Sequence, residues 1–309
     1  MSNSGQTASS SGGLSANALG AVFMMLSMAG FVLNDTFMKL VSKDVTIFQA
    51  ILIRGLFAVT LLYFIARWRN AFTLPLGLRA TMTNPAFVAR TCAEATATFL
   101  FLEALFNLPI ANVTAVLQLL PLTITLGAAL FFGEAVGWRR YGAILVGFFG
   151  VLLILQPGTS EFSIYSIYAL GAVVAVTVRD LATRKMPDEI PSLFVSFVTA
   201  IVIAIVGAAG SLGKPWEAIA PVHVLSLSLA AAAIALGYIC AVLTMRNGEV
   251  SFVSPFRYSI MIWALLIGYF VFSDVPTLLE LLGASIVVAS GLFTFYRERR
   301  TKLRQVAPR

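Results

Sequence analysis

The chain has 309 residues, of which 59% are hydrophobic and 11% are charged, with a formal net charge of +7. A soluble globular domain has a charged fraction of about 25%, so this composition excludes a soluble fold and predicts an all-α integral membrane protein. The basic excess does not indicate nucleic-acid binding, because these residues are scattered over predicted helix ends and the C-terminus, where they act as a topology signal.

Apolar segments long enough to cross a bilayer follow one another along the chain. We predict ten transmembrane helices, at 17–41, 46–66, 84–106, 110–132, 138–155, 163–184, 191–209, 222–245, 251–272 and 278–296. The Ser/Gly-rich residues 1–16 are expected to form a disordered tail, and residues 298–309 a basic cytoplasmic tail. An inside N-terminus puts fourteen Lys and Arg on inner segments and only Lys43 and Lys214 outside. Cytoplasmic segments are enriched in Lys and Arg, so both termini are expected inside.

The first span places Asn34, Asp35 and Lys39 in an otherwise apolar run. An ionisable group at the centre of such a helix costs about 2.5–3.5 kcal/mol on insertion scales, so Asp35 is expected to face a protein-lined or wet interior. The same chemistry recurs 145 positions later, with Asp180 matching Asp35 and Arg184 matching Lys39. Both acids precede their bases by four residues, the better orientation for a helical ion pair. Structural pairing is one interpretation, and gating or solute contact by Asp35 and Asp180 is the other.

An internal repeat accounts for this recurrence. At an offset of 140, Asn107 aligns with Asn247, and FFGE at 131–134 aligns with VFSD at 271–274. Residues 17–158 and 159–297 are therefore predicted to be two five-helix units. An odd number of crossings makes the second unit enter the membrane from the opposite side, which gives the inverted repeat found in many secondary transporters.

Other polar residues of the first half are candidate site residues. Arg54 either contacts a solute or only braces the first span. Arg90 and Glu94 lie one turn apart in the third span, and a mid-membrane carboxylate is a candidate proton or cation relay unless Arg90 neutralises it permanently. Gln118 lies just before Pro121, which removes a backbone hydrogen bond and favours a bend.

The second half supplies matching candidates. Arg179 adjoins Asp180, and Arg257 and Tyr258 lie in the ninth span in the region that matches Gln118. Polar groups at matched depths in both halves are what a midplane solute site needs. Tyr238 offers stacking surface for a flat solute, although a lone aromatic in a helix is more often a packing residue.

Glycines punctuate the fifth and tenth spans, as in GAILVGFFG and GASIVVASG. Small residues let helix backbones approach closely, so these spans are expected to brace the halves or form a homodimer contact, and not to line a path. No metal or cofactor is expected, because His223 is the single histidine and has no second histidine or cysteine partner in the sequence pattern.

Several features together resemble the drug/metabolite transporter superfamily, EamA type: the two five-helix halves, ND…K in span one, Arg54, LPIANVTAVLQLLPL before FFGE, and SPFRYS before GYFVFSDVP. The resemblance covers residues 17–297 and implies a secondary transporter that moves a small organic metabolite across the bacterial inner membrane by alternating access. The ND and P-F-R-Y motifs are most similar to the subgroup with bacterial riboflavin and S-adenosylmethionine carriers.

That subgroup implies import of a riboflavin-like vitamin. The alternative is an amino-acid carrier, or a carrier or exporter of a nucleoside-like metabolite such as S-adenosylmethionine. A channel and an intramembrane enzyme are remoter alternatives, since neither HExxH nor GxSxG occurs in the sequence. The nucleotide-binding pattern GxxxxGK[ST] is also absent, so direct ATP drive is not predicted.

Overall fold

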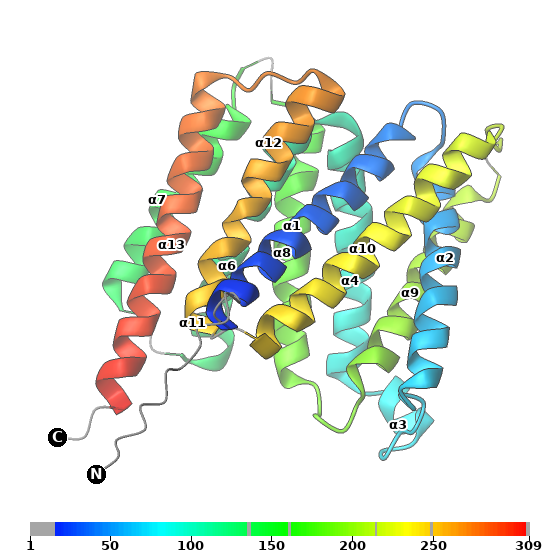
Figure 1. The fold of residues 1–309 in the computed structure, drawn as a ribbon, viewed down its shortest axis with the longest axis horizontal. Helices are drawn as coiled ribbons and strands as arrows, with labels where there is room; N and C mark the ends of the chain where they lie inside the picture. Colours follow the sequence, from blue (N-terminus) through cyan, green and yellow to red (C-terminus); the bar gives the residue numbers. More distant parts are fainter. Residues whose placement is uncertain (1–15, 135–136, 160–161, 214, 248–249, 307–309) are drawn as a thin grey trace, which may run out of the picture.

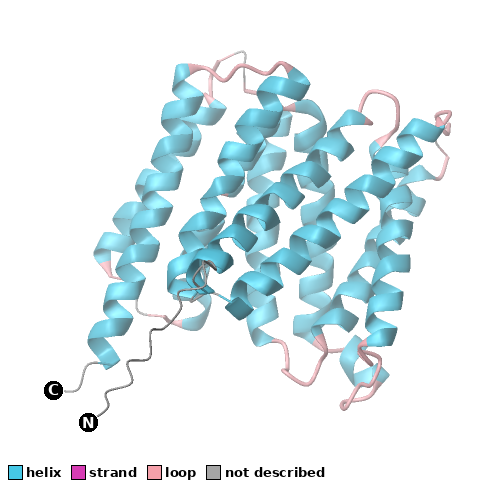
Figure 2. Ribbon diagram, viewed as in Figure 1, coloured by secondary structure: helices cyan, strands magenta, loops and turns pink. Residues whose placement is uncertain are grey.

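The computed structural model describes residues 16–134, 137–159, 162–213, 215–247 and 250–306. Long helices run side by side in one bundle (Figure 1), and no strand occurs among these residues (Figure 2). The predicted all-α fold is confirmed. Residues 1–15 and 307–309 lie outside the described ranges, and with them most of the predicted N-terminal tail and the end of the basic C-terminal tail.

The helices occur in an order close to the prediction. Their bounds are α1 Ala16–Leu40, α2 Ile47–Trp68, α3 Leu78–Met82, α4 Pro85–Asn107, α5 Ile110–Leu117, α6 Leu120–Phe132, α7 Trp138–Leu155, α8 Ile164–Lys185, α9 Ser192–Ser211, α10 Pro221–Asn247, α11 Val250–Val253, the 3-10 helix η1 Ser254–Tyr258, α12 Ser259–Phe272 and α13 Leu278–Val306. The last helix thus continues to Val306 instead of ending at 296. Its charged extension is rich in Arg, Lys and Glu, which favour helix.

Nine helical segments in the described part of the chain are long and apolar enough to cross a membrane. Helix α4 is not among these nine, although it has 23 residues, because Arg90, Glu94 and Glu103 make it less apolar. The count of ten spans therefore stays a prediction that depends on α4. The start of α1 and the end of α13 lie toward the same end of the bundle, as an even number of crossings requires (Figure 1).

Side-chain caps fix where the helices around the site begin. Thr46 and Gln49 form a capping box at the start of α2. The Asn84 side chain accepts hydrogen bonds from the backbone N–H groups of Ala86 at 3.0 Å and Phe87 at 3.1 Å, and Pro85 opens α4. Some of the orphan donors at these two helix ends are thereby satisfied by side chains, which favours the start of each helix at these residues.

The fourth span is broken near its middle. Helix α5 ends at Leu117 and α6 begins at Leu120, with Pro121 in its first turn, so the helix is interrupted where a bend is predicted. The corresponding span of the second half is also interrupted, because the 3-10 helix η1 precedes α12. Discontinuous helices at matched places in two halves are a feature of transporter binding sites, since the interrupted backbone there lines a cavity.

Helix pairing follows the symmetry of an inverted repeat. Helix α1 packs along α10, α4 along α8, α2 along α9 and α7 along α13. In the order of the two halves, α1, α2, α4 and α7 correspond to α8, α9, α10 and α13. Replacing each helix by its counterpart turns the α1–α10 pair into the α8–α4 pair and leaves the α2–α9 and α7–α13 pairs unchanged. Helices α1 and α8 open their respective halves and run in opposite directions (Figure 1). The bundle is therefore held together by contacts between its halves.

Two buried apolar clusters support this arrangement. One lies among α5, α6, α7 and α13 and includes Leu119, Val151 and Val287, which are 0 to 1% exposed. The other joins α1, α2, α4 and α10 and includes Met38 and Leu105, both fully buried. These clusters anchor the helices that present the polar side chains of the site.

Basic residues gather at one end of the bundle. The end of α2, helix α3, the start of α7 and the end of α8 lie on the face where α1 begins (Figure 1). These segments contain Arg67, Arg69, Arg79, Arg139, Arg140, Arg184 and Lys185. We call this end the basic face. It is the face that the sequence assigns to the cytoplasm.

Glycines bring α7 and α13 into close contact. A Cβ atom on Gly150 would lie 2.8 Å from the carbonyl oxygen of Gly283, and one on Gly283 would lie 2.5 Å from that of Gly150. These two glycines therefore brace one half against the other, as the small-residue pattern predicts. The homodimer contact through the glycine-rich helices stays a prediction.

Gly150→Ala is expected to lower the free energy of unfolding by about 1–3 kcal/mol, because the added methyl group overpacks a backbone contact. The measurement is the melting temperature of the purified protein in detergent. Gly142→Ala is the matched control on the same helix, where a Cβ atom has nothing within 4 Å. Equal melting temperatures for the two variants would contradict the proposed packing.

Candidate functional site

A cavity of about 450 Å³ lies among helices from both halves. Most of the predicted site residues line it: Asn34, Asp35, Arg54, Glu94, Gln118, Arg179, Tyr238, Arg257 and Tyr258. Arg90 and Asp180 are not among the lining residues. Ligand pockets measure about 300–1,000 Å³, so this volume suits a small organic molecule.

Both halves of the chain contribute helices to the walls of the cavity. The first half contributes α1, α2, α4, α5 and α6, and the second contributes α8, α10, η1, α12 and α13. A site at the interface of two repeats can open to either side when the repeats move against each other. The position of this cavity therefore matches that of a transported solute.

Asn34 joins a cation of α2 to a carboxylate of α1. The Arg54 guanidinium donates a hydrogen bond to the Asn34 side-chain oxygen at 3.2 Å, and the Asn34 amide donates to Asp35 at 2.8 Å. Asn34 is buried, whereas Asp35 and Arg54 are partly exposed and line the cavity. This network holds both charges in place while keeping them next to the space that a solute would occupy.

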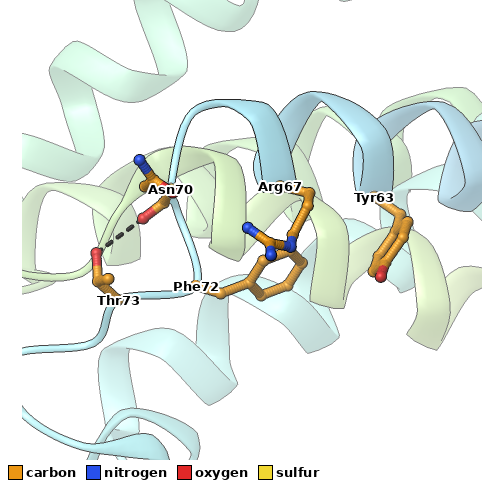
Figure 3. A pocket seen from close by; sticks show the side chains of 5 residues that line it. All are labelled: Tyr63, Arg67, Asn70, Phe72 and Thr73. Carbon is orange, nitrogen blue, oxygen red and sulfur yellow. Dashed lines mark hydrogen bonds between the residues drawn. The ribbon is translucent and has the colours of Figure 1, made fainter.

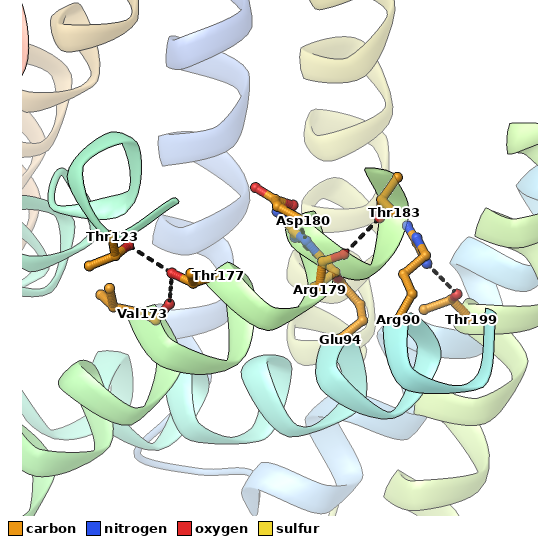
Figure 4. Close-up of polar contacts among 9 residues, drawn as sticks. All are labelled: Arg90, Glu94, Thr123, Val173, Thr177, Arg179, Asp180, Thr183 and Thr199. Atoms are coloured by element: carbon orange, nitrogen blue, oxygen red, sulfur yellow. Dashed lines mark hydrogen bonds and ion pairs between the residues drawn. The ribbon is translucent and has the colours of Figure 1, made fainter. Parts of the chain in front are cut away.

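A second charged cluster links the two halves (Figure 4). The Arg179 guanidinium on α8 lies 2.8 Å from a Glu94 carboxylate oxygen on α4, and its Nε lies 2.8 Å from Asp180. The side chains of Arg179 and Glu94 are 26% and 20% exposed. Charge-assisted hydrogen bonds of this kind are about twice as strong as neutral ones. The Arg179–Glu94 ion pair therefore fastens the first half to the second beside the cavity.

The predicted pair between Asp35 and Lys39 is wrong. Lys39 instead donates hydrogen bonds to the carbonyl oxygens of Leu105, at 3.0 Å, and Leu108. Its ammonium also lies 5.4 Å from the centre of the Phe272 ring. The carbonyls at a helix end have no partner within the helix, and the Lys39 ammonium satisfies those at the end of α4.

The predicted pair between Asp180 and Arg184 is also wrong. Arg184 lies 3.1 Å from Glu134, which follows α6, and both side chains are about half exposed. Pairs four residues apart on a helix contribute only about 0.2–0.5 kcal/mol, so contacts between helices override them.

Arg90 and Glu94 form no ion pair among the described residues, although the two charges lie near enough to interact. Arg90 donates a hydrogen bond to the Thr199 hydroxyl at 2.8 Å, whereas the ion-pair partner of Glu94 is Arg179 (Figure 4). The carboxylate is thus bound to the opposite half of the protein. Separating α4 from α8 at this point would require the ion pair to break.

Gln118 and Tyr258 occupy matched positions in the two broken spans, and both line the cavity. The Tyr258 hydroxyl group occupies the space that a Cβ atom on Gly291 of α13 would take, so a larger residue at this position would displace the tyrosine side chain. Gly291 itself lines the cavity, which corrects the prediction that the glycines of the tenth span do not line a path.

Aromatic and hydroxyl groups complete the lining. Tyr238 packs edge-on against Phe31, with ring centroids 5.3 Å apart, and both residues line the cavity. Among the aromatic and hydroxyl residues of the lining, sequence reasoning missed Phe31, Thr98, Phe101, Thr125, Ser254, Thr294 and Phe295. Thr98 follows Glu94 by one helical turn, so helical periodicity was a usable signal for it. The residues on α13 had no such signal, because that helix was expected only to brace.

Comparison with known proteins agrees with this geometry. Two stretches of the chain, residues 18–156 and 163–296, match the sequence pattern of the EamA-like transporter family. An S-adenosylmethionine uptake transporter of Rickettsia felis is 26% identical over 202 residues, covering 64% of this chain and 67% of the relative. A riboflavin transporter of Vibrio cholerae is 29% identical, covering 74% and 78%. A pseudopaline exporter of Pseudomonas aeruginosa is 23% identical, covering 88% and 94%.

A crystal structure is similar in fold, with a TM-score of 0.59 at 16% sequence identity, covering 90% of this chain and 99% of the other. The two stretches that match the family lie within the predicted five-helix units at 17–158 and 159–297. The apolar helices and the bacterial relatives support a multi-pass protein of the bacterial inner membrane. Because the matched stretches span most of both halves, the chain belongs to the EamA-like transporter family.

Proposed function

We propose that this membrane transporter imports a flat, uncharged vitamin resembling riboflavin by alternating access of its two halves. The observation that carries the proposal is the cavity between the halves, where aromatic rings and amide groups converge. Tyr238, Phe31 and Tyr258 offer faces for a planar ring system, and Asn34 and Gln118 offer amides to the polar edge of such a ring.

The charges of the lining support a solute without positive charge. Arg54, Arg179 and Arg257 contribute three cations and Asp35 and Glu94 two anions, so the formal sum is +3 − 2 = +1. A positive lining disfavours a cation such as a sulfonium, and it accepts a neutral or weakly acidic solute. A zwitterionic amino acid is compatible with the same charges and remains an alternative.

The relatives support the same solute class. Riboflavin transporters of Vibrio cholerae and Rhizobium johnstonii are 29% and 28% identical and match 74% of this chain. The S-adenosylmethionine transporter of Rickettsia felis matches 64%. Uptake of S-adenosylmethionine, and export of a metabolite as by the pseudopaline exporter that matches 88% of this chain, are therefore alternatives for the same cavity. We infer transport and not catalysis, since the family and its named relatives are transporters.

The test is uptake of labelled riboflavin by riboflavin-auxotrophic bacteria that express the chain, with the empty vector as control. We expect saturable uptake that excess unlabelled riboflavin abolishes and S-adenosylmethionine leaves unchanged. Trans-stimulation by internal riboflavin would identify a carrier, whereas its absence with non-saturable flux would identify a channel. No uptake from correctly inserted protein would reject riboflavin, and the same cells would then be tested with S-adenosylmethionine and amino acids.

A further inference from the structure

A second pocket, of about 420 Å³, lies on the basic face where α2 ends. Its walls are formed by Tyr63, Arg67, Asn70, Phe72 and Thr73. Figure 3 shows Arg67 between Tyr63 on one side and the loop with Asn70 and Thr73 on the other. None of these residues belongs to the cavity between the halves, so this pocket requires its own explanation.

The loop that forms one wall is held in a fixed shape. Asn70 has a positive φ of 53°, which turns the chain back immediately after α2. The Thr73 hydroxyl donates a hydrogen bond to the Asn70 carbonyl oxygen at 2.7 Å, and the Ala71 N–H donates to the Ala66 carbonyl at 2.9 Å. The pocket is therefore preformed, which lowers the entropic cost of binding a ligand.

Arg67 gives the pocket its charge. Its side chain is exposed, and it forms no ion pair with any residue that the structure describes. The Tyr63 hydroxyl and the Asn70 amide are further donors in the same walls, whereas the hydroxyl hydrogen of Thr73 already bonds to Asn70. A planar guanidinium with neutral donors beside it suits the oxygens of a phosphate group.

The other walls of the pocket are aromatic. Phe72 packs against Phe194 and Phe197 of α9, with ring centroids 6.3 and 5.4 Å apart, and against Tyr63 at 5.9 Å. Phe64, beside Tyr63 on α2, is 65% exposed on a helix long and apolar enough to cross a membrane. An exposed aromatic side chain on a candidate membrane span thus adjoins a residue that lines the basic pocket.

The pocket lies at the depth of the lipid head groups. Trp68, the last residue of α2, is 79% exposed, and the Arg69 guanidinium lies 5.2 Å from its ring centre. Trp138 at the start of α7 is 77% exposed and has the same relation to Arg139, also at 5.2 Å. Exposed tryptophans beside basic residues mark the boundary between the hydrocarbon layer and the head groups.

We propose that this pocket binds the phosphate group of an anionic phospholipid of the inner leaflet. Arg67 supplies the charge, Tyr63 and Asn70 supply neutral hydrogen bonds, and the acyl chains follow the exposed side of α2 past Phe64. Basic pockets beside membrane helices on the cytoplasmic side are suited to anionic head groups. The site is independent of the transported solute, since it rests on a different pocket at one end of the bundle.

The test is native mass spectrometry of the delipidated, full-length protein titrated with phosphatidylglycerol or with phosphatidylcholine of the same acyl chains. We expect tighter binding of phosphatidylglycerol, weakened about fivefold by Arg67→Gln, and a smaller loss for phosphatidylcholine, whose phosphate charge is balanced by its choline group. Arg67→Lys keeps the charge and is expected to retain most of the preference. Arg79→Gln is the matched control, because Arg79 is exposed on the same face but does not line the pocket.

Three results would overturn the proposal. Arg67→Gln could leave phosphatidylglycerol binding unchanged, or Arg79→Gln could weaken it equally, which would indicate general surface charge. Excess inorganic phosphate could displace the lipid and raise the melting temperature of the protein without lipid, which would identify a site for free phosphate. Because Arg67 is exposed and has no ion pair among the described residues, the variant is expected to fold, and its elution by size exclusion checks this.

Discussion

Asp35→Asn is expected to reduce the initial rate of solute uptake by about 30-fold or more while leaving the protein folded and inserted. Asparagine has the shape of aspartate, and its side-chain oxygen can still accept the hydrogen bond that Asn34 donates at 2.8 Å. The change therefore removes little packing. It does remove the negative charge of a residue that lines the cavity. Asn34 connects that residue to Arg54 by hydrogen bonds.

The measurement is uptake per amount of protein in the membrane fraction, with Asp180→Asn as the matched comparison. Asp180 is the sequence counterpart of Asp35, but it does not line the cavity and bonds to Arg179 of its own helix. Arg179 keeps Glu94 as a partner in that variant, so a smaller loss is expected. Wild-type uptake by Asp35→Asn, or equal losses in the two variants, would reject this role for Asp35.

Glu94→Gln is expected to abolish accumulation of solute against a gradient, together with the dependence of uptake on external pH. The ion pair with Arg179 joins α4 to α8, so an ionised Glu94 holds the halves together at this point. We propose that loss of this ion pair, with a coupling proton in place of Arg179, lets the halves move. Glutamine resembles the protonated carboxyl group, so the variant is expected to keep exchange of internal for external solute while it no longer responds to protons.

Both activities can be measured in proteoliposomes, as counterflow and as uptake driven by a pH gradient. Arg90→Gln is the control for removing a charge from α4, since Arg90 bonds to Thr199 and does not line the cavity. That variant is expected to keep its pH dependence. An unchanged pH profile in Glu94→Gln would show that the coupling proton is carried elsewhere or that transport is not coupled to protons.

The sequence was sufficient for the fold class, for the repeat and for the charged residues that line the cavity. Helix length and apolar composition are local properties of the chain, so they predicted the helices without any tertiary information. The cavity residues were predictable for a related reason. Asp35, Arg54 and Glu94 lie in apolar spans, and a charged side chain in a bilayer is stable only where it faces the protein interior or water.

Tertiary structure alone decided which of these charges meet. Glu94 pairs with Arg179, which is 85 positions away, and Lys39 bonds to carbonyls 66 and 69 positions away, because helix packing brings these groups together. Pairs within one helix contribute too little free energy to compete with such contacts. The same reason separates Asp35, which lines the cavity, from its sequence counterpart Asp180, which does not. A duplicated sequence places equivalent charges at equivalent points of two helices, and only the packing of the two halves decides which of them faces the solute.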